Sequence, residues 1–113
     1  MQVTHLFAGI PTGNLAAALA WYERLLGRPP DRFPHEHEAV WQLVDGALIY
    51  VVLDPERAGR GLLTLIVDDI DGWADEVRAR GIAVGEIDRT PGLQRTTLCD
   101  PDGNTIQIGQ VGG

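Results

Sequence analysis

The chain has 113 residues and a formal net charge of −7 at pH 7, a length that buries roughly two-thirds of the unfolded surface in one core. The acidic balance, without a run of arginines, excludes the phosphate-neutralising surface of a nucleic-acid-binding protein. Such acidity most simply keeps a small protein in solution, and the alternative is that it attracts a cationic ligand. Serine and lysine are absent from the sequence, which excludes serine-hydrolase, Schiff-base and Walker-type phosphate chemistry.

The first elements are a strand, a helix and a proline-rich edge. Residues 3–10 alternate in polarity as a strand does, and Pro11 and Gly13 are expected to end it. Apolar residues then recur at helical spacing from Leu15 to Leu26, with Asn14 as the N-cap and Gly27 just past the end. The prolines of segment 29–34 allow an edge strand at most.

A hairpin follows this edge. Two apolar strands, Glu38 to Val44 and Ala47 to Leu53, flank the dipeptide Asp45-Gly46, which is a strong signal for a two-residue turn. Counting outward from that turn places Trp41 opposite Tyr50.

The second half repeats the pattern. A strand begins at Leu62, a helix capped by Asp69 or Asp68 runs to Gly81, a further strand is predicted over 82–87, and a last hairpin closes on Asp102-Gly103. The same count from this turn places Leu98 opposite Gln107.

The two halves define one domain, 1–113, with module one at 2–54, a polar linker at 55–61 and module two at 62–111. Matching the helix starts, Asn14 and Asp69, makes Phe7 equivalent to Leu62. Matching the turn glycines, Gly46 and Gly103, makes Tyr50 equivalent to Gln107.

Each module reads as βαβββ, so the predicted fold is α+β, with two open sheets paired around a cavity. Strand alternation predicts a mostly apolar inward face with a few polar tips, which is typical of a small-molecule site. The predicted inward residues are His5, Phe7, Trp41, Leu43, Leu48, Tyr50, Leu62, Thr64, Ile66, Thr96, Leu98, Thr105 and Gln107.

The single cysteine, Cys99, permits no internal disulfide and is predicted to be a core residue. No apolar run approaches the 18–20 or so residues that span a bilayer, and the first residues, MQVTHLF, lack the pattern of a secretion signal. We therefore expect a cytoplasmic protein that binds neither membranes nor nucleic acids.

The segments AWYERLLG, VDDID and DPDGN, together with the two-module pattern, resemble the vicinal oxygen chelate superfamily. This superfamily includes glyoxalase I, extradiol dioxygenases, fosfomycin-resistance enzymes and bleomycin-resistance proteins. The resemblance covers nearly the whole chain and implies the paired-module fold, with sheet edges buried by pairing two chains, so we expect a homodimer.

The resemblance also indicates where a metal would be held. Metalloenzymes of the superfamily carry ligands, commonly histidine and glutamate, on the first and fourth strands of the modules. The matching positions here are Phe7, Tyr50, Leu62 and Gln107, of which two have no donor atom. We therefore expect neither a metal nor another cofactor.

The resemblance is closest to the bleomycin-resistance-like proteins, which sequester bulky cationic molecules without a metal. The main hypothesis is a metal-independent protein that sequesters an antibiotic or metabolite, with a cationic or aromatic ligand stacked on the inward aromatics. The alternative for those aromatics is that they only fill the cavity. The candidate ligand-binding residues are His5, Phe7, Trp41, Tyr50, Leu62, Thr64, Leu98 and Gln107.

A second hypothesis is a lyase, isomerase or dioxygenase-type enzyme that uses His5, His35 or His37 as general base. The run His35-Glu36-His37-Glu38 is more typical of a solvated edge with histidines paired to carboxylates than of a ligand pair. A third hypothesis is an interaction module that acts only through its sheet edges.

Overall fold

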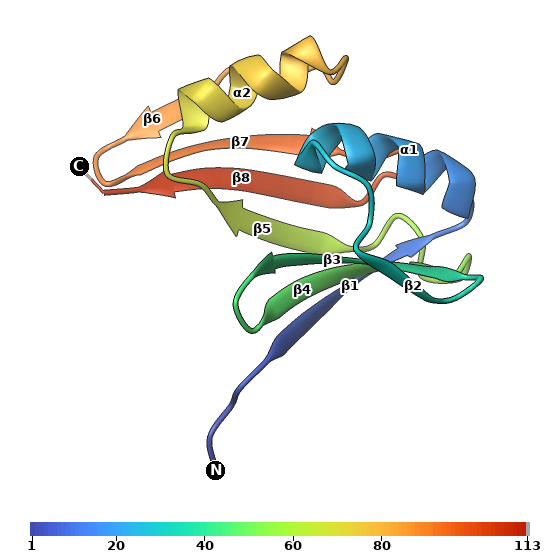
Figure 1. Cartoon of the computed structure of the whole chain (residues 1–113). Helices are drawn as coiled ribbons and strands as arrows, with labels where there is room; N and C mark the ends of the chain where they lie inside the picture. Colours follow the sequence, from blue (N-terminus) through green and yellow to red (C-terminus); the bar gives the residue numbers. More distant parts are fainter. Residues whose placement is uncertain (113) are drawn as a thin grey trace.

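The computed structural model describes residues 1–112 as two four-stranded sheets and two helices (Figure 1). The module-one sheet has the order β1-β4-β3-β2, with bounds β1 Leu6–Thr12, β4 Ala47–Leu53, β3 Glu38–Val44 and β2 Arg32–His35. The module-two sheet has the order β5-β8-β7-β6, with bounds β5 Leu62–Ile66, β8 Thr105–Val111, β7 Leu93–Cys99 and β6 Asp88–Thr90. The helices are α1 Leu15–Leu26 and α2 Ile70–Ala79. The predicted α+β fold of two βαβββ modules is confirmed.

The helix ends follow the predicted caps. The side chain of Asn14 accepts the Ala17 N–H at 3.1 Å, and the side chain of Asp69 accepts the Gly72 N–H at 3.1 Å. Gly27, at φ +78°, closes α1 in the left-handed conformation that glycine tolerates best. Neither helix of the described residues is long and apolar enough to cross a membrane.

One hydrophobic cluster joins the two modules. Trp41 and Ile49 of the module-one sheet share it with Leu98 and Ile106 of the module-two sheet, and Tyr22 of α1 lies among them. In Figure 1, α1 covers the module-one sheet and also reaches the ends of β7 and β8. The helix-facing sides of both sheets therefore meet in a common core, and the two opposite sides, which we call the open faces, carry no helix.

The turn Asp100–Asn104, the segment DPDGN of the sequence, fastens the modules together. The buried Asp100 carboxylate accepts the Tyr22 hydroxyl at 2.7 Å and the Asn104 side-chain amide at 2.8 Å. Asp102 accepts the Thr12 hydroxyl at 2.5 Å, and Asn104 also donates to the carbonyl of Pro11 at 2.8 Å. The conspicuous motif of the second module is thus a structural clamp on the β1–α1 loop of the first.

The predicted cross-strand pairs in both hairpins are wrong by one residue. In module one, a register shift between Gln42 and Val44 pairs Tyr50 with Val40 and turns Trp41 toward the helix side.

In module two, the turn is wider than two residues, because the Asp100 carboxylate accepts the backbone N–H groups of Asp102 and Asn104. This turn pairs Gln107 with Thr97 and places Leu98 opposite Ile106.

Three predicted strand boundaries also differ. β1 begins at Leu6 and not at residue 3. It continues through Pro11 to Thr12, which an edge strand permits because its outer N–H groups have no ladder partner. The predicted strand over 82–87 is irregular; its residue Ile82 is buried in the core, and the short strand β6 begins only at Asp88.

Candidate ligand site on the open sheet faces

In each module the first and last strands pair in parallel, so equivalent residues lie side by side on the two open faces. In module one, Phe7 lies beside Leu48 and Gly9 beside Tyr50. In module two, Leu62 lies beside Thr105 and Thr64 beside Gln107. The predicted equivalence of the two modules is therefore repeated residue by residue in the register.

The module-one open face has an aromatic floor. The Tyr50 ring lies across the backbone of Gly9 so closely that a Cβ atom at Gly9 would approach the ring to 2.7 Å. Phe7, 58% exposed, lies one strand position away, with the ring of His5 edge-on to it at 6.3 Å. The absence of a side chain at Gly9 thus leaves the space in which the Tyr50 ring lies against the backbone.

A hollow of about 470 Å³ lies over this floor, within the size range of small-molecule sites. Its wall includes one cation, Arg32, and one anion, Glu38, which has His35 at 3.5 Å. No described carboxylate lies within 4.0 Å of the Arg32 guanidinium. The residues that line the hollow are Phe7, Arg32, Pro34, Glu38, Val40, Leu48 and Tyr50.

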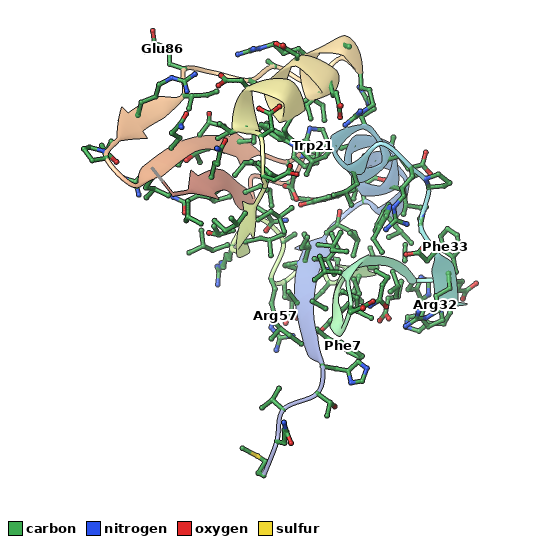
Figure 2. The ribbon with its side chains drawn as sticks, turned by 60° about the vertical axis from the view of Figure 1, so that its left-hand side comes forward. Phe7, Trp21, Arg32, Phe33, Arg57 and Glu86 are labelled. Atoms are coloured by element: carbon green, nitrogen blue, oxygen red, sulfur yellow. The ribbon has the colours of Figure 1, made fainter. Side chains whose placement is uncertain are left out.

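The module-two open face carries the equivalent hollow, of about 460 Å³, but its character is polar. Gln107 accepts a hydrogen bond from the Thr64 hydroxyl at 3.1 Å, and Arg95 lies 4.0 Å from Asp88. The residues that line it are Gly85, Glu86, Asp88, Arg95, Thr96, Thr97 and Gln107. Figure 2 shows Phe7 and Arg32 at one end of the molecule and Glu86 near the other, so the two hollows are separate.

Five of the eight candidate ligand residues lie on the open faces: Phe7, Tyr50, Leu62, Thr64 and Gln107. His5 precedes β1 and is exposed beside Phe7. Trp41 and Leu98 were expected there but are buried in the common core, where the Trp41 indole N–H donates to the carbonyl of Arg28 at 3.0 Å.

Several other residues lie on the opposite side from the one predicted. Leu43 and Thr96 were expected on the inward face; Leu43 packs against the core, and Thr96 pairs with the buried Ile108. Cys99, expected in the core, is exposed beside Thr105 on the open face. All these errors follow from the one-residue shifts in the hairpins, which reverse the faces of β3 and β7.

Because of the same shifts, the sequence did not predict that the module-one hollow is also lined by Arg32, Glu38 and Val40. Once Val40 is paired with Tyr50, alternation along β3 brings Glu38 to the open face, and pairing with β2 brings Arg32 next to Val40. Alternation gives this result only after the register shift between Gln42 and Val44 is known.

The remaining histidines lie at the exposed β2–β3 connection. His35 and His37 are exposed. Nε2 of His35 lies 3.5 Å from the Glu38 carboxylate, and Nε2 of His37 lies 3.4 Å from the Glu36 carboxylate. This matches the predicted solvated edge. None of the three histidines is among the residues that line the module-one hollow, so their role as general base stays a prediction.

The donor set at the superfamily's metal positions does not suit a divalent metal. Phe7 and Leu62 offer no donor atom, the Gln107 amide oxygen already accepts from Thr64, and Tyr50 would have to lose its proton to be a strong ligand. Within residues 1–112, no group of three or more histidine, cysteine, aspartate or glutamate side chains is placed to hold a metal ion.

The chain consists of two βαβββ modules, and each module has a hollow on its open face. This architecture is that of the paired-module proteins. The chain belongs to the Glyoxalase/Bleomycin resistance protein/Dioxygenase superfamily, whose family model matches residues 2–108. No curated protein matches the chain.

Solved structures agree with this assignment. A glyoxalase/bleomycin resistance protein from Catenulispora acidiphila DSM 44928 is 45% identical, with a TM-score of 0.90 over 96% of this chain and 98% of that one. TnmS3, an antibiotic binding protein from Streptomyces sp. CB03234, has the same fold at 23% identity and a TM-score of 0.77, covering 99% of each chain. A lactoylglutathione lyase from Agrobacterium tumefaciens has it at 20% identity and a TM-score of 0.74, covering 93% of this chain and 91% of that one.

Proposed function

We propose that the protein sequesters a planar aromatic small molecule, an antibiotic or a metabolite, on the open face of the module-one sheet, without a metal. The observation that carries this proposal is the Tyr50 ring packed against Gly9, beside the exposed Phe7 and beneath a hollow of about 470 Å³. An exposed aromatic floor with an apolar wall binds ring systems by stacking and burial.

The charges around the floor indicate which aromatic ligands would bind best. The Glu38 carboxylate lines the hollow and the whole chain carries a net charge of −7, and both favour a ligand with a basic group. Arg32 offers a guanidinium donor to an oxygen of the same ligand.

A second copy of the chain completes the site in this proposal. The hollow on each open face is lined by one module alone, and the helix-facing sides of both sheets are already joined in the core. The open faces also leave large apolar side chains uncovered, with Phe7 58%, Leu62 75% and Ile66 54% exposed. A homodimer that sets the module-one face of one chain against the module-two face of its partner would cover them and place Gln107 of the partner subunit across the ligand from Tyr50.

The family assignment is compatible with both binding and a reaction. One structure of the same fold is an antibiotic binding protein and another is a lactoylglutathione lyase, so the fold alone decides neither. The aromatic floor without a suitable metal donor set favours the binding role.

Isothermal titration of chelator-treated protein tests the ligand class, with ethidium as a planar aromatic cation and naphthalene-2-sulfonate as a planar aromatic anion. We expect saturable binding of ethidium and at least about a tenfold loss in Tyr50→Ala, because stacking is removed. The matched control is Phe33→Ala, which removes an exposed aromatic from β2 outside the hollow and leaves affinity unchanged. Equal losses in both variants, or no saturable binding of either probe, would overturn the proposal.

Sedimentation equilibrium tests the pairing of chains. We expect a dimer that Leu62→Glu converts to a monomer, because a charge would then face the covered apolar surface. A wild-type protein that is monomeric with and without ethidium would contradict the shared site.

A further inference from the structure

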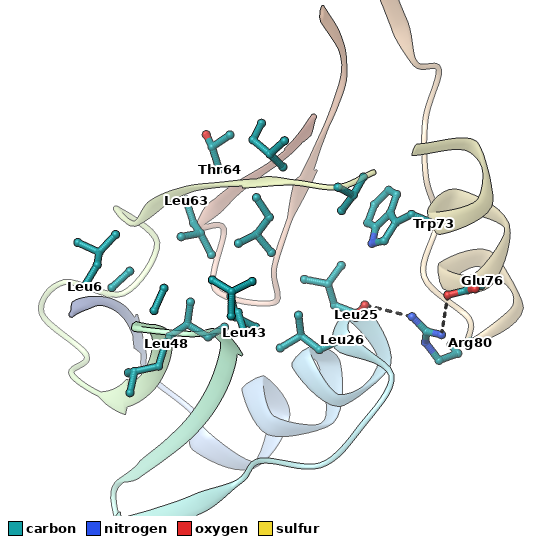
Figure 3. Close-up of a pocket in the computed structure, with 17 residues that line it drawn as sticks. Leu6, Leu25, Leu26, Leu43, Leu48, Leu63, Thr64, Trp73, Glu76 and Arg80 are labelled. Carbon is teal, nitrogen blue, oxygen red and sulfur yellow. Dashed lines mark hydrogen bonds and ion pairs between the residues drawn. The ribbon is translucent and has the colours of Figure 1, made fainter. Parts of the chain in front are cut away.

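A third hollow, which we call the intermodule cleft, lies on the helix side of the sheets and has a volume of about 440 Å³. The residues that matter here are Leu26, Leu43, Leu63, Leu65, Trp73 and Arg80. In Figure 3, β5 separates Leu63, which points into the cleft, from Thr64, which points to the other side. Leu48 is the one residue that this cleft shares with the module-one hollow, so the two are distinct sites.

Branched aliphatic side chains dominate the cleft walls, with Trp73 as the single aromatic. Two aliphatic side chains at the cleft are strongly exposed, namely Leu6 at 66% and Val44 at 65%. Without a second aromatic ring, the cleft cannot sandwich a planar ligand. It offers instead a continuous apolar surface that suits a flexible hydrocarbon chain.

The polar end of the cleft is Arg80 of the segment after α2. Its Nη2 donates to the carbonyl of Leu25 at 3.1 Å, and its Nε donates to the carbonyl of Arg24. Its Nη1 has only the Glu76 carboxylate, at 4.0 Å (Figure 3). The guanidinium is therefore held in place by two carbonyl groups while one nitrogen keeps a weak partner that an anion can replace.

Two further arginines lie near Arg80. A neighbouring hollow shares Arg80 with the cleft and is lined by Arg24 and Arg28 together with one acid, Glu23. Arg28 is paired with Asp31 at 2.6 Å. Gly27 borders the same hollow, and a Cβ atom there would lie 3.2 Å from the Arg80 guanidinium. Three of the nine basic side chains of the protein thus converge where the apolar cleft ends.

We propose that the intermodule cleft binds an aliphatic monocarboxylate, with its chain along Leu43, Leu63 and Trp73 and its carboxylate on Nη1 of Arg80 in place of Glu76. An apolar groove that ends at a fixed guanidinium matches a ligand with a hydrocarbon body and one anionic end. This site is separate from the aromatic floor and does not depend on the function proposed for it.

Tryptophan fluorescence tests this site with three probes of equal chain length, decanoate, decanol and decylammonium, each below the concentration at which it forms micelles. Trp73 lines the cleft, so we expect a saturable change with decanoate that is absent in Trp73→Phe. We expect decanoate to bind about tenfold more tightly than decanol, as one hydrogen bond to a charged group predicts, and decylammonium to bind most weakly.

Two substitutions separate recognition from folding. Arg80→Gln should make decanoate and decanol bind equally, whereas Arg78→Gln, an arginine of α2 that donates to the carbonyl of Val84, should change nothing. Glu76→Gln removes the competing carboxylate and should tighten decanoate binding, a gain that loss of structure cannot produce.

Three results would overturn the proposal: equal affinity for the three probes, the same effect of Arg78→Gln and Arg80→Gln, or competition between decanoate and ethidium for one site. A fourth is the absence of saturable binding combined with a change in monomer–dimer equilibrium in Val44→Glu. That result would make the cleft an interface between copies of the chain.

Discussion

The hydroxyl group of Tyr22 in α1 donates a hydrogen bond of 2.7 Å to Oδ2 of Asp100 in the last hairpin, 78 residues away along the chain. Both side chains are buried, and the bond joins the helix of module one to the sheet of module two. The same oxygen also accepts from the Asn104 side-chain amide, so Tyr22 supplies one of two side-chain donors to a buried carboxylate oxygen, where the loss of a donor is costly.

Tyr22→Phe removes the donor and leaves Asp100 buried with fewer partners. We expect a loss of about 1–3 kcal/mol in the free energy of unfolding, measured by urea denaturation. Tyr50→Phe is the control, since the Tyr50 ring lies on a half-exposed face outside the core. Equal stabilities of the two variants would show that the Tyr22–Asp100 bond contributes nothing.

The same bond predicts alkaline behaviour. Burial, followed by the hydrogen bond to Asp100, raises the pKa of Tyr22 well above its usual value of 10.0. Because the folded pKa is the higher one, this group's contribution to stability is complete below about pH 10 and falls as the pH rises further. In Tyr50→Phe, where Tyr22 is the last tyrosine, tyrosinate absorbance should appear together with the loss of far-ultraviolet circular dichroism. Tyrosinate formation in a folded protein would contradict this.

Gly9 is predicted to set the position of the Tyr50 ring. Gly9→Ala places a Cβ atom 2.7 Å from that ring and forces it to move. We expect ethidium affinity to fall several-fold in Gly9→Ala with the fold retained, as measured by titration and circular dichroism. Gly13→Ala is the matched control, because Gly13 lies outside the hollows and a Cβ atom there would meet only Asp102, at an ordinary contact distance of 3.6 Å. The interpretation fails if both variants bind ethidium as the wild type does.

Asn104 makes four side-chain hydrogen bonds at the clamp. Its Nδ2 donates to Pro11 and Asp100, both at 2.8 Å, and its Oδ1 accepts the N–H groups of Gly59 at 3.0 Å and Gly61 at 2.7 Å. We expect Asn104→Ala to lower the free energy of unfolding by about 2–4 kcal/mol. Asn14→Ala, which removes one N-cap bond, should cost about 1 kcal/mol. A larger loss of unfolding free energy in Asn14→Ala than in Asn104→Ala would contradict the role of Asn104 in joining the modules.

The parts of the fold that were predictable from the sequence depend on local signals. Asn14, Asp69 and Gly27 mark helix ends through bonds to residues three or four positions away, and the repeat of module one in module two predicted two βαβββ modules. The open-face positions of Phe7 and Leu62 followed from the same repeat.

The errors have distant or three-dimensional causes. The register shift near Leu43 has no clear signal in the sequence. Because of it, the neighbour of Tyr50 is Val40 and not the predicted Trp41. The wide turn that misplaced Leu98 is held by Asp100, whose own position depends on Tyr22 of the other module. Arg32 was missed because its place depends on the same register shift, and the intermodule cleft could not be predicted because it requires the packing of both modules.

The central claim, an aromatic ligand held on the Tyr50 face without a metal, is tested most directly by thermal unfolding of chelator-treated protein. The protein is heated alone, with ethidium, and with Mg²⁺, Mn²⁺, Fe²⁺, Ni²⁺ or Zn²⁺, because a ligand of the folded state raises the midpoint by mass action. The account predicts a rise with ethidium that Tyr50→Ala abolishes and no rise with any metal. A rise with one metal and none with ethidium would contradict it and would indicate a metal site among side chains such as His5, His35 and His37.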